Sequence, residues 1–365
     1  CEENFDDYFG GLNKDNPEYD SHERVGIKEK SRYGWDKFDP RFNVSEEPNE
    51  PNTFGWVVEI DPKKPDSKPV KRTSLGRFKH EAANCVLSHD NRLVIYMGDD
   101  EAFEHIYKFV SKNKYIEGKS DYSDLLDNGK LFAAKLYPDG SMRWLPMEFG
   151  VTGIREEMGF KNQADVMIEV RKAAKILCAT EMDRPEDIQV NPSTGKVYAC
   201  MTNNAKRIIK NAANPRIPNI HGHIIEIDHA KDENGKTKHT DWQGKWEVYY
   251  IGGEELSNPD NIAFDNSGNL WIATDGMEKT RNKADGFYKM HHQNKAPARM
   301  LSAPAGSEVT GPEFTPDGKN LFLSIQHPGE GSNYLDPSTQ WPEFKNGTPP
   351  KPSVISVARK DDHSF

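Results

Sequence analysis

The chain has 365 residues, of which 29% are charged and 35% belong to the hydrophobic set, so its composition is that of a globular protein. Its net charge of −10 argues against the basic face that a nucleic-acid-binding protein needs, and no nucleic-acid partner is expected. No stretch approaches the roughly 18 apolar residues of a membrane span, so none is predicted.

The first part of the chain, from residue 1 to about residue 52, is polar and rich in proline, and it predicts a long loop rather than a domain. It begins with Cys1 and shows no signal-peptide pattern. Because Cys1-Glu2-Glu3-Asn4 reads like the end of a motif, we expect the chain to be the later part of a longer protein. The acidic residues after Cys1 suit a thiolate metal ligand better than a core position.

Three further cysteines, Cys85, Cys178 and Cys200, lie far apart in the sequence. They form no CxxC pair, which excludes a zinc knuckle and argues against a disulfide framework. Each stands in an apolar stretch, so we expect all three to be small, buried hydrophobic side chains.

A strand–turn–strand phrase recurs along the chain, with Asn, Asp and Gly in the turn, where a short hairpin needs positive φ. Repeated short hairpins are typical of propeller blades, whereas the alternative, a two-sheet sandwich, does not predict that one phrase recurs. We therefore predict an all-β protein that forms a single β-propeller domain over residues 1–365. Four clear copies and one weaker copy span residues 85–96, 188–198, 262–272, 312–323 and 134–144.

Two stretches depart from the β pattern. Residues 163–178 carry apolar side chains at helical spacing, which predicts an amphipathic helix inserted between blades. Residues 336–352 are rich in proline and polar residues, and they predict a loop.

Acidic residues stand at corresponding places before four of the repeats. Counted back from the last apolar residue before each turn, Glu186 and Asp260 lie four positions away, and Glu81 and Glu308 lie six. Even offsets put each acid on the face of its reference residue if the strand is regular. Since the innermost strands of a propeller line its channel, the acids would meet at one mouth. Such a cluster indicates hard cations such as Ca²⁺, the alternative being solvated loop residues.

Two cationic residues accompany these acids. Arg184 stands two residues before Glu186, and its planar guanidinium suits a phosphate group, the alternative being an ion pair with Asp183 or Glu186. Lys79 stands two residues before Glu81, and the alternative for it is an ordinary surface lysine.

Other polar residues rank lower as site candidates. Asp99, Asp100 and Asp275 close the second strands of their hairpins, where carboxylates often only cap turns. Glu104 and His327 could reach a site from loops, although a lone histidine is more often structural. The sequence has no Gly-rich phosphate loop, no GxSxG elbow and no HExxH motif.

At these motifs the chain resembles the PhoX-type alkaline phosphatases, a bacterial family of calcium- and iron-dependent phosphomonoesterases. The resemblance extends over nearly the whole chain, and its motifs are specific in combination. The stretches that carry it are CEENF (1–5), GWVVEIDP (55–62), LGRFKHE (75–81), YMGDD (96–100), MDRPE (182–186), PDNIAFD (259–265) and TG through IQHPGE (310–330).

The resemblance implies a six-bladed propeller, exported by the twin-arginine route to the periplasm or beyond, that hydrolyses phosphate esters with two ferric (Fe³⁺) and three calcium (Ca²⁺) ions. It implies that Arg184 contacts the phosphate, and it places Asn261 and Lys79 in matching motifs as further catalytic candidates. The family's N-terminal portion, with its export signal and additional propeller strands, is missing here and is expected as a separate partner. The metal ligands that the resemblance implies are Cys1, Glu2, Glu81, Glu186, Asp260 and Glu308.

Two other functions stay open on the sequence alone. A calcium-dependent lactonase or arylesterase propeller also arranges Glu, Asn and Asp around a central Ca²⁺, as Glu81, Asn261 and Asp260 could, but it has no use for a cysteine ligand or iron. A non-catalytic propeller scaffold predicts tolerance of substitution at Cys1 and Arg184. It also predicts a large exposed apolar patch, which the low hydrophobic content does not suggest.

Overall fold

The structure is a computed structural model that describes residues 1–119, 122, 124–151, 153–291, 294–361 and 363–365. The chain divides into two compact units. Unit 1 comprises Cys1–Leu136, Met142–Glu181 and Lys231–Gln243, and unit 2 comprises Tyr137–Ser141, Met182–Ala230 and Gly244–Phe365.

Unit 1 is built on an antiparallel sheet in which each strand pairs with the next along the chain. A separate pair joins β1 (Val58–Glu59) and β2 (Val70–Lys71), and a short helix, α2 (Asp124–Asp127), precedes β6. The strands of the sheet are β3 (Asn84–Leu87), β4 (Arg92–Gly98), β5 (Ile106–Lys114), β6 (Gly129–Leu136) and β7 (Ser141–Pro146), the last of which begins with a residue of unit 2.

The N-terminal segment is more ordered than the predicted long loop. It contains α1 (Tyr19–Arg24) and four 3₁₀ turns, η1 (Phe5–Tyr8), η2 (Trp35–Lys37), η3 (Pro40–Phe42) and η4 (Glu50–Thr53). Apolar residues that are widely spaced along this segment form a buried cluster of their own. The prediction missed this cluster because most residues of the segment are polar. The cluster consists of Phe5, Phe9, Leu12, Val25, Ile27 and Val44.

The predicted helical insertion is present as two short helices, α3 (Gln163–Ile168) and α4 (Val170–Ile176), after a 3₁₀ turn, η6 (Glu156–Met158). The helices meet at Glu169, whose ψ of 41° leaves the helical region. The Glu169 carboxylate accepts a hydrogen bond from the Ser21 hydroxyl, so a tertiary contact accompanies the break. The buried face of the helices, formed by Val166, Val170, Ala173 and Ala174, packs on the sheet of unit 1.

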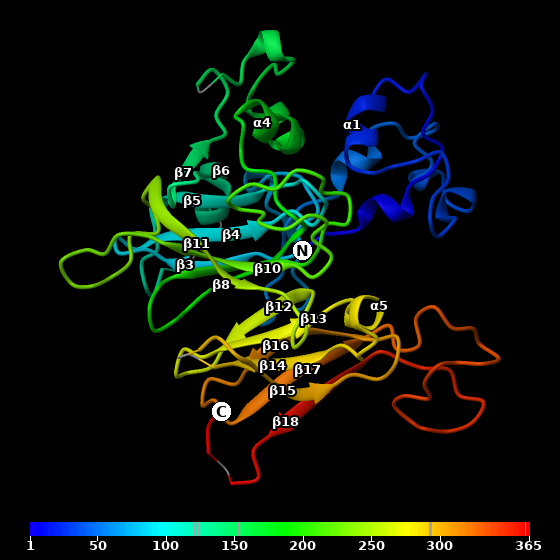
Figure 1. Cartoon of the computed structure of the whole chain (residues 1–365). Helices are drawn as coiled ribbons and strands as arrows, with labels where there is room; N and C mark the ends of the chain where they lie inside the picture. Colours follow the sequence, from blue (N-terminus) through cyan, green and yellow to red (C-terminus); the bar gives the residue numbers. More distant parts are fainter. Residues whose placement is uncertain (120–121, 123, 152, 292–293, 362) are drawn as a thin grey trace. The chain divides into compact units, whose positions relative to one another are not determined.

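Unit 2 consists of three antiparallel meanders. In Figure 1 the first strands of the meanders lie side by side, with β12 next to both β8 and β16. Meanders that present their first strands to one another in this way are propeller blades. The blades are β8 (Pro185–Val190), β9 (Val197–Met201), β10 (His223–Asp228) and β11 (Gln243–Ile251); β12 (Pro259–Phe264), β13 (Leu270–Thr274), β14 (Gly286–Met290) and β15 (Pro297–Ser302); and β16 (Glu308–Phe314), β17 (Asn320–Gln326) and β18 (Ser353–Ala358).

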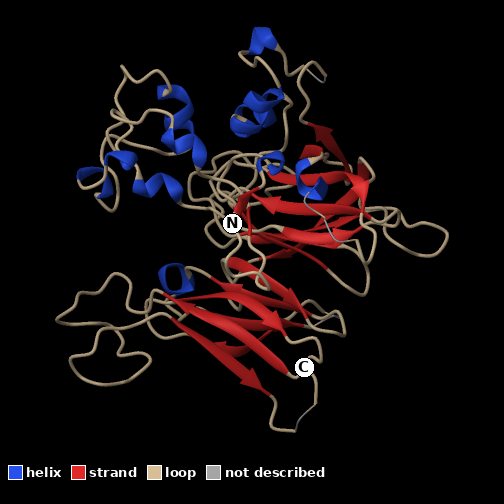
Figure 2. Cartoon of the chain, turned by 180° about the vertical axis from the view of Figure 1, so that it is seen from behind, coloured by secondary structure: helices blue, strands red, loops and turns tan. Residues whose placement is uncertain are grey.

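Figure 2 shows how strongly strands and loops dominate unit 2, where α5 (Met277–Arg281) is the sole helix among the described residues. The predicted loop 336–352, every residue of which is described, contains no helix or strand. Across all described residues, no helix has the length and apolar character needed to cross a membrane.

All five predicted strand–turn–strand phrases form hairpins in the structure. Each hairpin turn contains one residue with positive φ, which is the physical reason for the Asn and Gly residues that revealed the repeat. These residues are Asn91, Gly140, Gly195, Gly268 and Gly318.

The prediction for the cysteines is correct for Cys200, which is buried, and wrong for Cys85 and Cys178, which are exposed. Cys85 shares an exposed face of β3 with Leu87. Cys178 lies beyond α4 in a left-handed conformation, with a φ of 55°, so the apolar residues around it pack while its own side chain does not.

A buried polar network holds the long connection between β9 and β10 in unit 2. The Asp183 carboxylate pairs with Arg207 and accepts a hydrogen bond from Asn219 Nδ2 at 2.9 Å. Asn219 Nδ2 also donates to His223 Nδ1 at 2.9 Å, while His223 Nε2 donates to the Ala213 carbonyl at 2.9 Å. Because one ring nitrogen accepts and the other donates, the network requires a neutral imidazole. Burial lowers the pKa of His223 to about 4.

We expect this histidine to make the stability of the protein fall in acid. In the unfolded chain His223 titrates near its ordinary pKa of about 6.5. Its stabilising contribution is therefore complete above pH 6.5 and is lost as the pH falls from there toward 4. Replacement of His223 by Gln should remove up to roughly 3 kcal/mol of this pH dependence. Urea unfolding at pH 7 and pH 4.5 measures it, and equal pH dependence in variant and wild type would contradict the assignment.

Candidate functional site

Two blades of unit 2 begin their first strands with the same kind of four-residue pattern. Residues 185–188 read Pro-Glu-Asp-Ile at the start of β8, and residues 259–262 read Pro-Asp-Asn-Ile at the start of β12. In both strands the register shifts between the proline and the isoleucine, which marks a β-bulge. A bulge changes the direction of side chains, so the regular strand that the even-offset prediction assumed is absent at both acids.

The residue before each proline has a left-handed backbone, with a φ of 59° at Arg184 and 56° at Asn258. Residues before proline favour extended conformations, so this geometry is strained by an amount on the order of 1–3 kcal/mol. Neighbouring hydrogen bonds hold it in place: Asn258 Oδ1 accepts from Ser257 Oγ at 2.6 Å and from Thr280 Oγ1 at 2.7 Å. The same strain two residues before Glu186 and two residues before Asp260 indicates a functional constraint at both positions.

The carboxylates that follow these strained residues converge. Glu186 and Asp260 each place a carboxylate oxygen within 4.8 Å of the other. Asp260, Asp275 and Glu308 also place one oxygen each within 4.8 Å of one another. Glu186, Asp260 and Glu308 are all buried. The acids predicted at the start of β8, β12 and β16 are therefore brought together within unit 2.

The electrostatics of this acid cluster favour a bound cation. Burial, reinforced by the negative charge of Asp275 and opposed by a hydrogen bond with His327, raises the pKa of Glu308. His327 Nε2 lies 3.4 Å from Glu308 Oε2, and this contact raises the pKa of His327 to about 9. Several carboxylate oxygens within reach of one point form the donor set of a hard cation, so the residues present fit Ca²⁺.

Arg184 lies at the edge of the acid cluster. Its Nη2 is 2.7 Å from Glu186 Oε1, and its side chain is 27% exposed. The ion pair with Glu186, one of the two alternatives raised by the sequence, is thus formed, whereas Asp183 is paired with Arg207 instead. A partly exposed guanidinium fixed to a buried acid presents a planar set of N–H donors that suits an anion such as phosphate.

The residue after each acid ties one blade to the next. The Asp187 carboxylate accepts from the Ile262 amide at 2.9 Å, and Asn261 Oδ1 accepts from the Gly311 amide at 2.8 Å. Asn261 Oδ1 also accepts from the Thr310 hydroxyl. The structure therefore gives Asn261, a catalytic candidate, a contact that sets the spacing between β12 and β16.

Unit 1 holds a second group of acids at the open end of the β3–β4 hairpin. Burial, followed by the charges of Asp100 and Glu81, raises the pKa of Glu3 to about 9. The Glu81 amide donates to the Gly98 carbonyl at 3.3 Å, which holds Glu81 against the end of β4. Unit 1 therefore contains three neighbouring carboxyl groups that repel one another unless a proton or a cation intervenes.

Lys79 is not the surface lysine that the sequence allowed as an alternative, since it is only 6% exposed. Its Nζ lies 3.0 Å from Asp6 Oδ1 and 2.9 Å from Glu101 Oε2. Although burial opposes it, the charges of these two acids raise the pKa of Lys79. The ammonium group fastens the N-terminal segment to the loop that follows β4.

The first two residues differ in their surroundings. Cys1 is exposed. Glu2 is held by unit 1: its Oε2 accepts from the Trp56 amide at 3.0 Å, and its Oε1 lies 2.8 Å from Lys71 Nζ. Both carboxylate oxygens of Glu2 thus have partners that anchor the chain terminus.

Sequence reasoning ranked two acids of these clusters too low. Asp275 and Asp100 rank lower as site candidates on the sequence because acids at the ends of second strands often only cap turns, yet each belongs to one of the groups described above. The missing signal is the geometry of an antiparallel hairpin, in which the end of the second strand lies opposite the start of the first. Pro259 pairs with Thr274, so Asp260 and Asp275 are brought to the same end of the hairpin.

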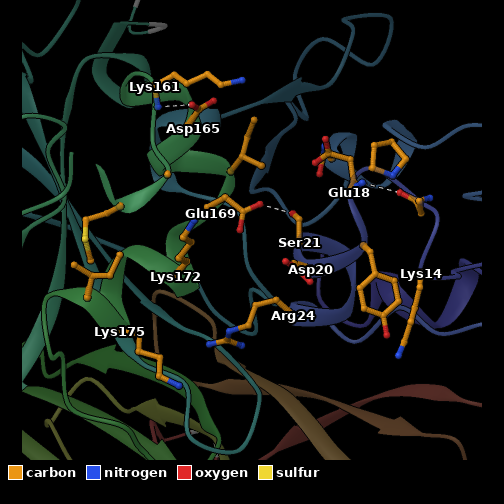
Figure 3. A pocket seen from close by; sticks show the side chains of 18 residues that line it. Lys14, Glu18, Asp20, Ser21, Arg24, Lys161, Asp165, Glu169, Lys172 and Lys175 are labelled. Carbon is orange, nitrogen blue, oxygen red and sulfur yellow. Dashed lines mark hydrogen bonds between the residues drawn. The ribbon is translucent and has the colours of Figure 1, made fainter. Parts of the chain in front are cut away.

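A wide cleft of about 1270 Å³ lies in unit 1 between α1 and the pair α3 and α4 (Figure 3). The hydrogen bond between Ser21 and Glu169 spans it. As far as the described residues show, no predicted site residue lines this cleft, so we assign no chemistry to it. Its cationic lining residues are Lys14, Arg24, Lys161, Lys172 and Lys175.

Comparison with solved structures shows a strong similarity to a phosphatase. A solved structure of Pseudomonas fluorescens PhoX in complex with vanadate, a transition state analogue, matches with a TM-score of 0.91 and 37% sequence identity. The match covers 100% of this chain and 68% of the other. Residues 1–329 also match the family described as alkaline phosphatase PhoX.

Two further structural matches are remote. A putative 6-phosphogluconolactonase from Bacteroides uniformis has a TM-score of 0.33 and 11% identity over 74% of this chain and 70% of its own. A periplasmic gluconolactonase from Pseudomonas aeruginosa has a TM-score of 0.31 and 10% identity over 77% and 80%. Neither likeness is strong enough to support the lactonase alternative. No curated protein sequence matches the chain.

The family match and the close structural match agree with the motifs that carry the resemblance. They confirm the predicted propeller fold, and among the functions that the sequence left open they confirm the phosphatase. The chain belongs to the PhoX alkaline phosphatase family, and it is a β-propeller enzyme that hydrolyses phosphomonoesters.

Proposed function

We propose that the carboxylates at the entrances of the blades hold the metal ions at which the phosphate ester is hydrolysed. The observation that carries this proposal is the approach of Asp260, Asp275 and Glu308 to within 4.8 Å of one another. We leave Glu2 outside the ligand set because both of its carboxylate oxygens already have partners. The proposed ligands are Cys1 and Glu81 from unit 1 and Glu186, Asp260, Asp275 and Glu308 from unit 2.

The chemistry of the donors indicates which ions these residues take. Carboxylate oxygens suit Ca²⁺, and a set that includes the Cys1 thiolate suits a transition metal, for which we propose Fe³⁺. When bound, such cations supply charge neutralisation for the phosphoryl oxygens.

The protein's own contribution centres on Arg184. Its guanidinium can donate two parallel N–H groups to phosphoryl oxygens while Glu186 fixes its position. Charge that develops on the phosphoryl group is then met by a donor that needs no reorganisation. Asp187 and Asn261 act indirectly, since they hold β8, β12 and β16 at the spacing that the acids require. For Lys79 we propose the same indirect role in unit 1, because Asp6 and Glu101 bind its ammonium group.

Replacement of Arg184 by Ala should lower kcat/KM for p-nitrophenyl phosphate roughly 100- to 1,000-fold, because the transition state loses a preorganised donor. Arg184→Lys should recover only part of this loss, since an ammonium lacks the planar fork. Arg155→Ala, which removes an exposed arginine of unit 1, is the matched control. Full activity of Arg184→Ala in steady-state assays would rule out the proposed contact.

Replacement of Glu186 by Gln should reduce activity together with bound metal, because one buried carboxylate ligand is lost. Elemental analysis of iron and calcium per chain measures this directly, with and without a chelator. In the same experiment Cys1→Ser should lose iron and retain calcium. Wild-type protein that is active without iron, or a Glu186→Gln variant with full metal content and full activity, would contradict the ligand assignment.

We further propose that residues 1–365 belong to one propeller domain, which an N-terminal portion of the same protein completes. Support comes from β16, β17 and β18, which form a meander of three strands among the described residues, whereas β8–β11 and β12–β15 are meanders of four. Support also comes from the relative, whose chain is longer. We expect slow hydrogen exchange at the outer edge of β18 in the intact protein and a single unfolding transition. Fast exchange at that edge, or two transitions, would speak against this proposal.

The resemblance to exported phosphatases supports a periplasmic or secreted location reached by the twin-arginine route. Fractionation of the native host measures this location, and recovery of the protein in the cytoplasmic fraction alone would contradict it.

A further inference from the structure

A cavity of about 230 Å³ opens beside the acid cluster of unit 2. Asp275 lines this cavity and also belongs to the group formed with Asp260 and Glu308. His327, whose Nε2 lies 3.4 Å from Glu308 Oε2, is another lining residue. The cavity therefore adjoins the carboxylates at which we place the phosphoryl group.

Hydrogen bonds between separate segments fix the walls of this cavity. The start of α5 is held by Asp285, whose carboxylate accepts from the amides of Gly276 at 3.0 Å and Met277 at 2.9 Å. Glu278 Oε2 accepts from the Gly306 amide at 2.8 Å, which joins α5 to the loop before β16. A Cβ at position 306 would lie 2.7 Å from the Glu330 amide nitrogen, so the loop and the segment after β17 approach closely.

The lining carries more negative than positive charge. Its carboxylates are Asp275, Glu278, Asp285 and Glu330, and its cationic or protonatable side chains are Lys279 and His327. The Asp285 carboxylate is bound by the backbone of α5, so the exposed charges at the rim are those of Glu278, Lys279 and Glu330. Lys279 Nζ lies 3.6 Å from Glu330 Oε2, so Lys279 offsets part of this charge. The positive charge of the partly exposed His327 lies 3.4 Å from Glu308 Oε2 and 3.9 Å from Glu330 Oε2, and Glu308 offsets it.

We propose that this cavity receives the alcohol part of the substrate and selects small neutral or positively charged leaving groups, such as polyols and amino alcohols, over anionic ones. The inference rests on the proposed function, since it needs the phosphoryl group at the neighbouring acids. The volume is below the roughly 300–1,000 Å³ of sites that enclose larger ligands, which fits a leaving group of a few heavy atoms. Rim carboxylates attract an ammonium group and repel a carboxylate, so the selection has a direct electrostatic cause.

Two phosphomonoesters of similar size test this inference. Phosphoethanolamine carries a positive leaving group and 3-phosphoglycerate a negative one, and wild-type enzyme should have the higher kcat/KM for the first. Glu278→Gln and Glu330→Gln should each lower the ratio of the two kcat/KM values about threefold, and the double variant about tenfold. Lys279→Gln should raise the ratio, a change that misfolding cannot imitate. The ratio in wild type should fall as salt screens the rim charges.

Glu255→Gln is the matched control, because Glu255 is an exposed glutamate of unit 2 that does not line the cavity. p-Nitrophenyl phosphate, assayed in parallel on the metal-loaded enzyme, separates this inference from the function on which it rests. Hydrolysis of that ester with a ratio that none of the rim variants shifts would overturn the inference alone. An equal shift in Glu255→Gln would also overturn it, since net charge would then explain the effect. No hydrolysis of any ester by the wild type would overturn the proposed function itself.

Discussion

Repulsion between buried carboxylates is the interaction on which the rest of this structure depends. Glu186, Asp260 and Glu308 are each buried. A charged carboxylate that is removed from water is costly in free energy unless a partner offsets its charge. Left alone, such groups would move apart or take up protons, and the raised pKa of Glu308 records that tendency. The fold holds them together all the same, with a left-handed residue and a bulge before each of two acids. Local strain of this kind persists only where the surroundings fix it.

Those surroundings are the bonds between the blades. Asp187 reaches the backbone of β12, and Asn261 reaches the backbone of β16, so each acid sits next to a residue that sets the distance to the following strand. The two contacts use the same sequence position, directly after the acid. The residue that carries the charge and the residue that sets the distance between the strands are therefore neighbours in the sequence. A change in either residue alters the acid cluster.

The sequence predicted the parts of the fold that local chemistry determines. Turn residues with positive φ revealed the hairpins, and acidic residues at even offsets of four or six before the turns pointed to Glu186, Asp260 and Glu308. The structure brings these acids together, although the first strands that were expected to be regular are bulged at Glu186 and Asp260. Sequence patterns did not predict features that depend on distant partners. The break at Glu169 accompanies a contact with Ser21, and the place of Asp275 depends on cross-strand pairing. Exposure of Cys85 likewise follows from which face of β3 is covered.

Protons and cations are the two means by which such a cluster can be relieved, and they differ in their dependence on pH. A shared proton cancels one charge in a pair, and it leaves once the pH exceeds the raised pKa, which for Glu3 is about 9. A divalent cation cancels two charges and binds more tightly as the carboxylates lose their protons. In alkaline solution the shared protons are therefore lost at the pH at which the repulsion between the carboxylates is strongest. Arg184 and His327 offset part of the charge on Glu186 and Glu308, and bound cations would offset more of it as protons leave the cluster.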